Sequence, residues 1–376
     1  MSPIALEKTT AAVLRGPKDL AIEERTLYRP PPGSCQLKVV ATGLCGSDLH
    51  YFKHGRNGDF AVRAPLVLGH EAAGIITQVG PDVTHLRPGQ RVAIECGIMC
   101  RKCFFCLKGR YNLCRSMRFC SSASVYPHQD GTLQRVMNHP AHVLHPIPDN
   151  VSYELGALAE PLSVLIHASR RAQLAEGQTV LVFGVGSIGI LACAIAKAHN
   201  ASLVVAIDIN QARLEFATSN GFASQTYCLA RTEPAKSPEE QLRQVKEQAS
   251  QVLSHFGEPQ GFDVVFECTG AETAIQMSIH AAMTGGKVML IGMGTRNVML
   301  PLSTAALREV DIQGSFRYAN TYPEALKLLS SGKLGNVEKL ITHRFKLENT
   351  ASAFDLLARG QDDHGNMVLK VMIGSS

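Results

Sequence analysis

The feature that most constrains the fold is a glycine-rich turn between two apolar segments in the middle of the chain. Residues 184–189 read Gly-Val-Gly-Ser-Ile-Gly; the apolar run Thr179–Phe183 precedes them, and Ser187–His199 continues with helical spacing. This order predicts a buried strand, a tight turn and a helix. Further strands are expected at Leu203–Ile207, Phe262–Glu267, Lys287–Gly292 and Asp311–Ser315, and helices at Arg213–Asn220, Ser237–Phe256, Ala271–Met283 and Tyr322–Leu334. Alternating strands and helices predict an α/β domain with a doubly wound parallel sheet.

The glycine turn stands in the context that a dinucleotide site requires. Gly184, Gly186 and Gly189 permit a tight turn and a close approach of the backbone to a pyrophosphate, which the positive end of the following helix attracts. Asp208 ends the next apolar run, where a carboxylate accepts hydrogen bonds from the adenosine ribose and repels a 2′-phosphate. The sequence therefore predicts NAD as a cofactor. The nearby Arg213 leaves NADP as an alternative, although an arginine can also stack on adenine.

Four cysteines form the strongest single motif. Cys100, Cys103, Cys106 and Cys114 have the spacing C-x2-C-x2-C-x7-C, and four thiolates this close can complete a tetrahedral shell around Zn²⁺ with no position left for water. Among 11 cysteines, disulfides or ordinary thiols are alternatives, but no secretory signal is visible. A nucleic-acid-binding zinc module would need a basic helix that reads bases, which is missing here. The motif predicts a structural zinc site.

A second group of metal-ligand types is dispersed. Cys45, Ser47, Asp48 and His50 stand close together, and His70-Glu71 follows some twenty residues later. Cysteine, histidine and carboxylate all bind zinc. The residues alone do not show that Cys45 meets His70, and single residues of these types are more often packed side chains than ligands.

Composition excludes several classes of protein. The hydrophobic fraction is 45%, the charged fraction 18% and the formal net charge +5, which exclude disorder as the main state and give no footprint for nucleic acid. Thr179–Ala196 carries no charge and has the length of a membrane span, but its glycines divide it into a strand and a helix. We expect no membrane partner and a cytoplasmic location.

The chain length predicts two domains. The first third is rich in strands, with examples at Gln36–Ala41, Gly74–Val79 and Arg91–Glu95, and another strand is expected at Met367–Ile373. The expected division is a β-rich domain over residues 1–160, the α/β domain over 161–302, and a return to the first domain over 303–376.

Several segments together resemble the zinc-containing medium-chain alcohol dehydrogenases. They are Gly69-His70-Glu71-Ala72-Ala73-Gly74 with Gly80 and Val83, and Cys45-Gly46-Ser47-Asp48. Three longer strings are similar to the sorbitol and related polyol dehydrogenases of that family: Cys45–Phe60, Glu160–Val164 and Gly314–Thr321. The resemblance implies a Rossmann domain inserted in a GroES-like, β-rich catalytic domain. The four-cysteine set departs from animal sorbitol dehydrogenases, which have lost it, and leaves an L-arabinitol or xylitol dehydrogenase as an alternative.

The resemblance also implies roles for individual residues. Catalytic zinc would be held by Cys45, His70 and Glu71, with Glu160 beside it as the first proton acceptor and Ser47 and His50 as a proton relay. Polyol would be bound by Tyr51, Glu160, Arg317 and Tyr318; for Arg317 an ion pair is the alternative. The cofactor-contacting positions would be Gly184, Gly186, Ile188, Gly189, Asp208, Arg213, Ile291, Gly292, Met293, Ser315, Phe316 and Arg317.

These expectations describe a zinc-dependent enzyme that oxidises a secondary alcohol of a polyol to a ketose with NAD⁺, assembled as a homotetramer with one catalytic and one structural zinc per chain. Other zinc dehydrogenases, for example one acting on threonine, differ in substrate alone. A non-catalytic NAD- and zinc-binding regulator is the alternative from another class. Its mark would be the loss of a catalytic ligand, and none is lost here.

Overall fold

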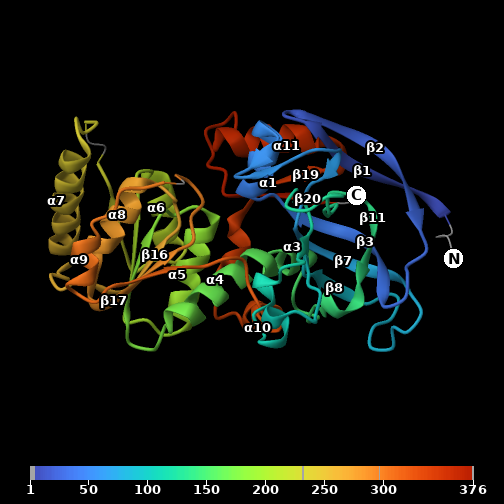
Figure 1. Cartoon of the computed structure of the whole chain (residues 1–376), viewed down its shortest axis with the longest axis horizontal. Helices are drawn as coiled ribbons and strands as arrows, with labels where there is room; N and C mark the ends of the chain where they lie inside the picture. The colour runs from blue at the N-terminus through green and yellow to red at the C-terminus, as the bar shows by residue number, and fades with distance from the viewer. Residues whose placement is uncertain (1–4, 231–232, 296, 375–376) are drawn as a thin grey trace. The chain divides into compact units, whose positions relative to one another are not determined.

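A computed structural model describes residues 5–230, 233–295 and 297–374. The chain forms two compact units. The first contains the chain up to Pro161, Ala319–Ser331 and the chain from Glu338; the second contains Leu162–Tyr318 and Gly332–Val337. Each unit has its own sheet and core (Figure 1).

The first unit is built on a seven-stranded sheet in which the last strand of the chain pairs with an early one. The strands run in the order β12-β8-β7-β3-β20-β19, and β11 also pairs with β3. Because β20 and β3 are antiparallel partners, the C-terminal segment completes the N-terminal sheet. The bounds are β3 Ser34–Gly43, β7 Glu71–Val79, β8 Arg91–Ile94, β11 Val136–Pro140, β12 Leu144–Pro146, β19 Ile341–Lys346 and β20 Lys370–Gly374.

Smaller elements surround this sheet. Strands β1 (Ala5–Gly16), β2 (Asp19–Tyr28) and β6 (Leu66–Val67) form a three-stranded sheet, β9 (Gly97–Ile98) pairs with β10 (Arg118–Phe119), and β4 (Arg56–Asn57) pairs with β5 (Phe60–Ala61). The helices are α1 Gly46–His54, α2 Phe104–Leu107, α3 Tyr153–Ala157, α10 Tyr322–Ser331 and α11 Thr350–Arg359, with 3₁₀ turns at Tyr111–Leu113, Ala141–Val143, Val337–Leu340 and Leu347–Asn349. Helix α4 (Ala159–Ala172) begins at the end of the first segment of this unit.

The second unit is a six-stranded sheet in which every described pair is parallel. Its order is β15-β14-β13-β16-β17-β18. The strands are β13 Thr179–Phe183, β14 Leu203–Asp208, β15 Gln225–Cys228, β16 Phe262–Glu267, β17 Ala282–Leu290 and β18 Asp311–Gly314; the helices are α5 Ser187–Ala198, α6 Gln211–Ser219, α7 Pro238–Phe256, α8 Glu272–Ala281 and α9 Leu302–Ala306. Helices lie on both faces of the sheet (Figure 1), which confirms the predicted fold class.

Burial follows from the hydrophobic runs. The central strands of the parallel sheet bury side chains on both faces, and Val180, Leu181 and Val182 are all fully buried. In helix α7 the buried positions Val245, Ala249 and Val252 recur every three or four residues, so one stripe faces the core and the rest meets solvent.

Two predicted helices end earlier than expected. The segment predicted as a helix over Ala271–Met283 ends at Ala281, because Ala282 is already extended and begins β17. The helix predicted over Tyr322–Leu334 ends at Ser331, and the next residue, Gly332, has a φ of +72°. A left-handed glycine is a common way to end a helix.

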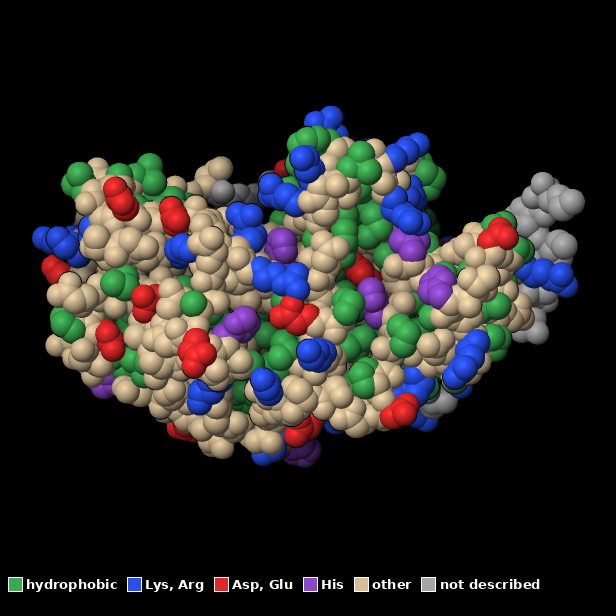
Figure 2. Space-filling view, turned by 90° about the horizontal axis from the view of Figure 1, so that it is seen from below, with side chains coloured by type: hydrophobic (Ala, Val, Ile, Leu, Met, Phe, Trp, Pro, Cys, Tyr) green, Lys and Arg blue, Asp and Glu red, His purple; other side chains and the backbone are tan. Residues whose placement is uncertain are grey.

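The uncharged stretch Thr179–Ala196 contains strand β13 and most of helix α5, with the glycine turn between them. Among the described residues, no helix is long and apolar enough to cross a membrane. The surface in Figure 2 shows basic and acidic side chains interspersed on the visible face.

Candidate active site

Cys45, His70 and Glu71 come together at one end of the first sheet. Cys45 is the N-cap of α1, two residues after the end of β3, while His70 and Glu71 stand where β7 begins. Their ligand atoms all lie within 4.8 Å of one another. Strand β7 pairs with β3 in a register that puts Glu71 opposite Gly43. A Cβ atom at Gly43 would collide with the Glu71 carboxylate, so the glycine makes room for this side chain.

Asp48 orients the histidine. This aspartate is fully buried, and its Oδ1 lies 3.1 Å from His70 Nδ1. The same oxygen accepts hydrogen bonds from Ser121 Oγ at 2.5 Å and from the Gly69 N–H at 3.3 Å. With Nδ1 engaged, Nε2 of His70 is the nitrogen left for a metal. A carboxylate behind a metal-ligating histidine is a recurring arrangement, because it fixes the ring and its tautomer.

Lys370 holds the carboxylate of Glu71. Its Nζ donates to both oxygens of Glu71, at 2.8 and 2.7 Å, and to the backbone oxygen of Leu44 at 3.1 Å. Both side chains are almost completely buried. Although burial acts to lower the pKa of Lys370, the charges of Glu71, Cys45 and Glu160 raise it. The lysine is therefore a cation that offsets the acidic groups of the site.

The pKa shifts reflect the same charges. Burial acts against charge on His70, but Asp48 and Cys45 raise the pKa of His70 well above its usual range. Burial likewise opposes charge on Asp48, but His70, Ser121 and the Gly69 N–H lower the pKa of Asp48. Each of these two groups thus favours the charged form of the other. The donor set of thiolate, imidazole and carboxylate fits Zn²⁺, which would replace the proton on the imidazole.

The other predicted catalytic residues lie on α1 and α4. Ser47 Oγ is 3.4 Å from both Cys45 Sγ and His70 Nε2, so its hydroxyl borders the metal ligands. Glu160 is buried in the first turn of α4, and its charge influences the pKa of both Lys370 and Cys96. His50 is exposed on α1. Partial burial, with the positive charges of His54 and Lys53, lowers the pKa of His50.

The predicted polyol-binding residues are placed in two parts of the chain. Tyr51 is buried on α1, and its hydroxyl accepts a hydrogen bond from the Ala123 N–H at 3.1 Å. Arg317 and Tyr318 follow β18 in the second unit. Arg317 has a φ of +51°, and its guanidinium lies over the Phe316 ring at 4.9 Å, while Tyr318 is buried.

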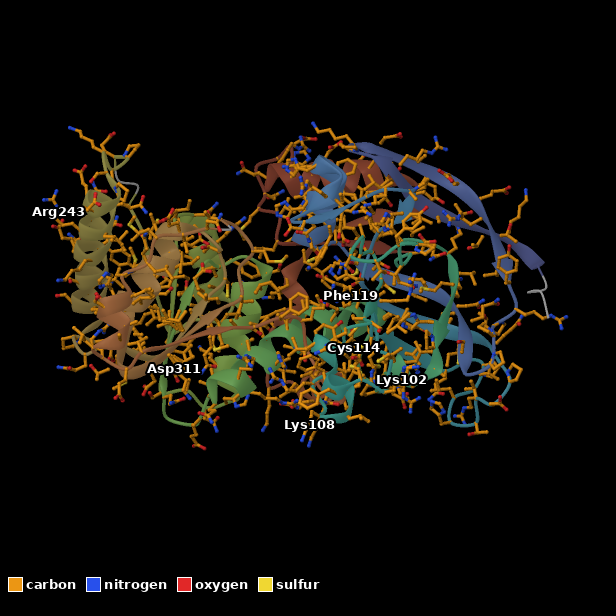
Figure 3. All side chains as sticks on the ribbon, viewed as in Figure 1. Lys102, Lys108, Cys114, Phe119, Arg243 and Asp311 are labelled. Carbon is orange, nitrogen blue, oxygen red and sulfur yellow. The ribbon has the colours of Figure 1, made fainter. Side chains whose placement is uncertain are left out.

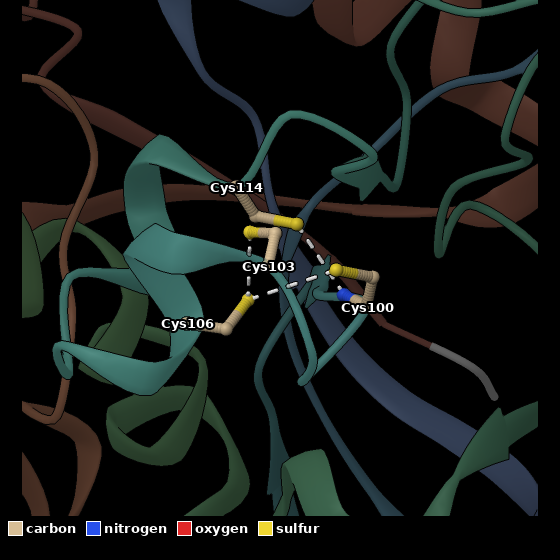
Figure 4. A group of neighbouring side chains, drawn as sticks. All are labelled: Cys100, Cys103, Cys106 and Cys114. Carbon is tan, nitrogen blue, oxygen red and sulfur yellow. Dashed lines mark hydrogen bonds between the residues drawn. The ribbon is translucent and has the colours of Figure 1, made fainter.

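The four cysteines of the predicted structural zinc site converge in a short lobe (Figure 4). Cys103 Sγ and Cys106 Sγ are 3.6 Å apart, Cys100 Sγ and Cys106 Sγ 4.0 Å, and the Cys100 N–H donates to Cys114 Sγ at 3.3 Å. With Zn–S bonds near 2.3 Å, a tetrahedron requires about 3.8 Å between sulfur atoms. The lobe therefore fits zinc closely. Lys102 and Lys108, labelled with Cys114 in Figure 3, belong to the same segment of the chain.

The thiols of the lobe differ in acidity. Backbone N–H donors from Cys106 and Arg115 lower the pKa of Cys103 to about 6, whereas burial and the neighbouring thiols raise the pKa of Cys106 to about 12. Cys103 therefore loses its proton more readily than Cys106, and a bound metal would displace the protons that remain.

The glycine turn has the shape of a dinucleotide cradle. Gly184 has a φ of +85°, and a Cβ at Gly189 would collide with the Gly184 backbone oxygen. A Cβ at Gly186 would meet nothing within 4 Å, so the turn is open where a pyrophosphate would approach the start of α5. Ile188 lies in the first turn of that helix.

Asp208 and Arg213 are the polar side chains that the sequence predicts for the cofactor site. Asp208 is buried and accepts hydrogen bonds from the Val185 N–H at 2.7 Å and the Asn210 N–H at 2.9 Å, which ties it to the glycine turn. The Nε of Arg213 is buried and has no hydrogen-bond partner among the described residues. A buried donor without a partner, five residues after Asp208 in the sequence, is consistent with a ligand that completes this site.

The remaining predicted cofactor positions follow strands β17 and β18. The N–H groups of Ile291 and Gly292 both donate to the Glu267 backbone oxygen at 2.9 Å, and Met293 is exposed. The N–H of Ser315 donates to the Leu290 oxygen, and Phe316 is exposed. These residues stand at the carboxyl ends of neighbouring strands, where doubly wound sheets bind ligands.

Sequence reasoning missed three residues that shape these sites. No role was assigned to Asp48, although its place at the N3 position of the helix capped by Cys45 was a usable signal. Lys370 gave no signal in the sequence, since it lies 299 residues from its partner Glu71. Glu267 gave none either, since it reads as the end of a strand.

Comparisons with known proteins agree with this geometry. Residues 31–149 match the alcohol dehydrogenase GroES-like domain, and residues 187–331 match the zinc-binding dehydrogenase domain. Sorbitol dehydrogenase of Rattus norvegicus is 44% identical over 373 residues, which cover 99% of this chain and 98% of the relative.

Two solved structures from Escherichia coli show the same fold. L-Idonate 5-dehydrogenase superposes with a TM-score of 0.85 at 28% identity, covering 98% of each chain. An alcohol dehydrogenase solved in complex with NADH superposes with a TM-score of 0.83 at 26% identity, covering 98% of this chain and 99% of that one. With both family domains matched and one relative similar over nearly its full length, the chain belongs to the zinc-binding alcohol dehydrogenases.

Proposed function

We propose that this protein is an NAD-dependent polyol dehydrogenase that oxidises a secondary alcohol of a sugar alcohol to a ketose. The observation that carries the proposal is the convergence of Cys45 with the buried His70 and Glu71, in a chain 44% identical to a sorbitol dehydrogenase over nearly its whole length. A complete ligand set argues against a non-catalytic regulator built on the same fold.

The protein's own residues prepare the metal site. When bound, zinc supplies Lewis-acid stabilisation of negative charge on a substrate oxygen, and NAD⁺ supplies the hydride acceptor. Cys45, His70 and Glu71 would hold the zinc. Asp48 keeps His70 Nδ1 engaged, so that Nε2 faces the ligand position. Lys370 keeps the Glu71 carboxylate in place and limits the negative charge of the site.

The alcohol must lose a proton as well as a hydride, so that ketone, NADH and one proton are formed. We assign Glu160 as the first proton acceptor, because it is a buried carboxyl group whose charge is felt at Lys370. Ser47 is assigned to the relay because its hydroxyl borders Cys45 and His70. His50, exposed on the same helix, can pass the proton to solvent.

The assignments for cofactor and substrate rest on chemistry and placement. Asp208 is assigned to the adenosine ribose, because its carboxylate is hydrogen-bonded to the Val185 N–H in the glycine turn and would repel a 2′-phosphate, which favours NAD. For the polyol we assign Tyr51, Glu160, Arg317 and Tyr318, because a chain of hydroxyl groups needs several donors and acceptors. Tyr51 accepts the Ala123 N–H, which leaves its own O–H able to donate.

The test is NADH formation by the purified protein with sorbitol, xylitol, L-arabinitol, galactitol, ethanol and L-threonine. Each substrate is assayed with NAD⁺ and with NADP⁺, and again after removal of zinc by a chelator. We expect the highest kcat/KM with a polyol and NAD⁺, loss of turnover on chelation and recovery with added Zn²⁺. Preference for ethanol or threonine, or turnover that survives complete zinc removal, would contradict the proposal.

We further propose a homotetramer in the cytoplasm. Support for assembly comes from apolar side chains that the single chain leaves exposed, on the cysteine lobe at Phe104 and Leu107 and near the edge strand β18 at Leu302 and Leu307. Light scattering of the purified protein gives the mass in solution.

A further inference from the structure

The order of the strands fixes which part of a dinucleotide lies over which strand. Asp208 ends β14, the glycine turn follows β13, and β16 and β17 come next across the sheet. A dinucleotide lies across the carboxyl ends of the strands, with its ribose at the acidic residue and its pyrophosphate at the glycine turn. The nicotinamide half therefore extends over the ends of β16 and β17.

Glu267 is the last residue of β16 and joins two turns at that place. The side chain is fully buried. Its carboxylate accepts hydrogen bonds from the Thr269 N–H at 2.8 Å, from the Gly270 N–H at 3.0 Å and from the Thr269 hydroxyl. Its backbone oxygen accepts the Ile291 and Gly292 N–H groups at 2.9 Å each. One residue thus holds the turn after β16 and the turn after β17.

The two turns touch with no space between them. Gly270 has a φ of +74°, a Cβ at Gly292 would collide with its nitrogen, and a Cβ at Gly294 would collide with its oxygen. The turn after β16 also contacts the glycine turn after β13, because a Cβ at Gly184 would lie 2.5 Å from Cγ2 of Thr269. A shift of residues 269–270 would therefore displace both walls of the cofactor site.

We propose that Glu267 is a positioning residue for the nicotinamide half of the cofactor. Its carboxylate fixes the turn at residues 269–270, and the turn at 291–294 is built on that one. The inference rests on the proposed NAD site and adds the group that sets the shape of one half of it.

The chemistry of Glu267 agrees with this role. Burial raises the pKa of Glu267, and the donors from Thr269 and Gly270 oppose that rise. A buried carboxyl group is costly unless hydrogen bonds compensate it. Here the compensation comes from the Thr269 hydroxyl and from two main-chain N–H groups of the same turn, so the carboxylate and the turn conformation depend on each other.

The test compares two ligands that share the adenosine diphosphate ribose part. Affinities for NADH and for ADP-ribose, which lacks nicotinamide, are measured with the zinc-loaded protein by fluorescence and calorimetry. The variant Glu267→Gln replaces one of the two accepting carboxylate oxygens with an NH₂ group, which cannot accept a hydrogen bond from the N–H groups of the turn. We expect NADH to bind about tenfold more weakly, which is the loss of one charge-assisted hydrogen bond, while ADP-ribose binds within about twofold of the wild type.

Asp263 gives a matched control on the same strand. It is the second residue of β16, near the end of the strand opposite Glu267, and its carboxylate accepts hydrogen bonds from the N–H and the hydroxyl of Thr179, both at 2.8 Å. Asp263→Asn should lower the thermal midpoint without changing either affinity. If Glu267→Gln does not fold, Thr269→Val, which deletes the hydroxyl donor, takes its place. It should weaken NADH binding by a smaller factor and leave ADP-ribose binding nearly unchanged.

Three results would overturn the inference. The first is an unchanged NADH affinity in both Glu267→Gln and Thr269→Val, and the second is an equal loss of affinity for NADH and for ADP-ribose in these variants. The third is a loss of NADH affinity in Asp263→Asn as large as that in Glu267→Gln. Because the readout is binding without substrate, failure of the polyol proposal leaves it unaffected. If the wild type prefers NADPH, the same comparison is made with NADPH and 2′-phospho-ADP-ribose.

Discussion

The two groups of metal ligands in this protein are built in opposite ways. The cysteine lobe takes four identical ligands from residues 100–114, three of them only partly buried, and closes the shell with sulfur. The other group takes three different ligands from β3–α1 and β7 and buries two of them. The lobe is a local clamp, by which we mean that all its ligands come from one short segment. The second group depends on the whole first sheet, including Lys370 from the last strand.

This difference suggests that the cysteine lobe serves the stability of the fold and that the group of Cys45, His70 and Glu71 serves the reaction. A closed set of thiolates leaves no position for substrate, so it stabilises the fold around it. A three-ligand set can keep a position open, and its carboxylate, cation and hydroxyl neighbours adjust the charge where the reaction occurs. The predictions below test whether the two groups can be disrupted independently, in order of their expected effect on turnover.

The largest effect is expected from Cys45→Ser. Loss of this ligand should reduce the zinc content from two ions per chain to one and lower kcat/KM at least about a thousandfold, because Lewis-acid stabilisation contributes several kcal/mol to the barrier. NADH affinity should stay unchanged. Metal analysis, steady-state kinetics and NADH titration measure the three quantities, and Cys228→Ser, at an exposed thiol, is the matched control. Turnover near the wild-type rate would disprove the zinc assignment.

The same contrast explains what could be predicted from sequence. The lobe and the glycine turn were predictable because their groups lie within a few residues of one another, and the strand–turn–helix context of Asp208 is also local. The convergence of Cys45 with His70 came from family resemblance alone, since pairing of β3 with β7 is a long-range contact. Ser121 and Lys370 bind partners 73 and 299 residues away, and no local pattern carries that information.

An intermediate effect is expected from Asp48→Asn. Loss of the carboxylate behind a metal-binding histidine typically costs 10- to 100-fold in metal affinity or activity. We expect a weakening of that size, of roughly 10- to 100-fold, at the site of Cys45 and no change at the lobe. Competition with a chromophoric chelator, which resolves the two zinc ions, gives both affinities. Asp149→Asn, at an exposed carboxylate, is the control.

The pH dependence of the same variant has a definite sign. Asp48 raises the pKa of His70, so in the metal-free protein the ion pair stabilises the fold below the unfolded-state pKa of His and loses this effect as pH rises through the raised value. Zinc needs the neutral imidazole, so affinity should rise with pH through the neutral range. In Asp48→Asn the rise in zinc affinity with pH should be shallower, because the imidazole of His70 binds a proton less tightly and the proton competes less with zinc. An equally steep rise would exclude Asp48 as its cause.

The smallest effect on turnover is expected from Cys103→Ser in the lobe. This substitution removes the thiol whose pKa is lowered to about 6, and the chain should retain one zinc. At saturating substrate we expect kcat within about threefold of the wild type, since four sulfur ligands would surround the metal on all sides and leave no place for a substrate oxygen. The thermal midpoint should fall by roughly 5 °C or more, because a structural zinc contributes folding free energy.

Limited proteolysis locates that loss of stability. Trypsin has exposed cleavage sites in the lobe at Arg101, Lys102, Lys108, Arg110 and Arg115, and Figure 3 labels Lys102 and Lys108. Trypsin should cut Cys103→Ser between residues 101 and 115 much faster than Cys228→Ser, with cleavage elsewhere unchanged. If cleavage instead spreads through the first unit and kcat falls as far as in Cys45→Ser, the lobe is not a local clamp, because the catalytic ligands would then depend on it for their positions.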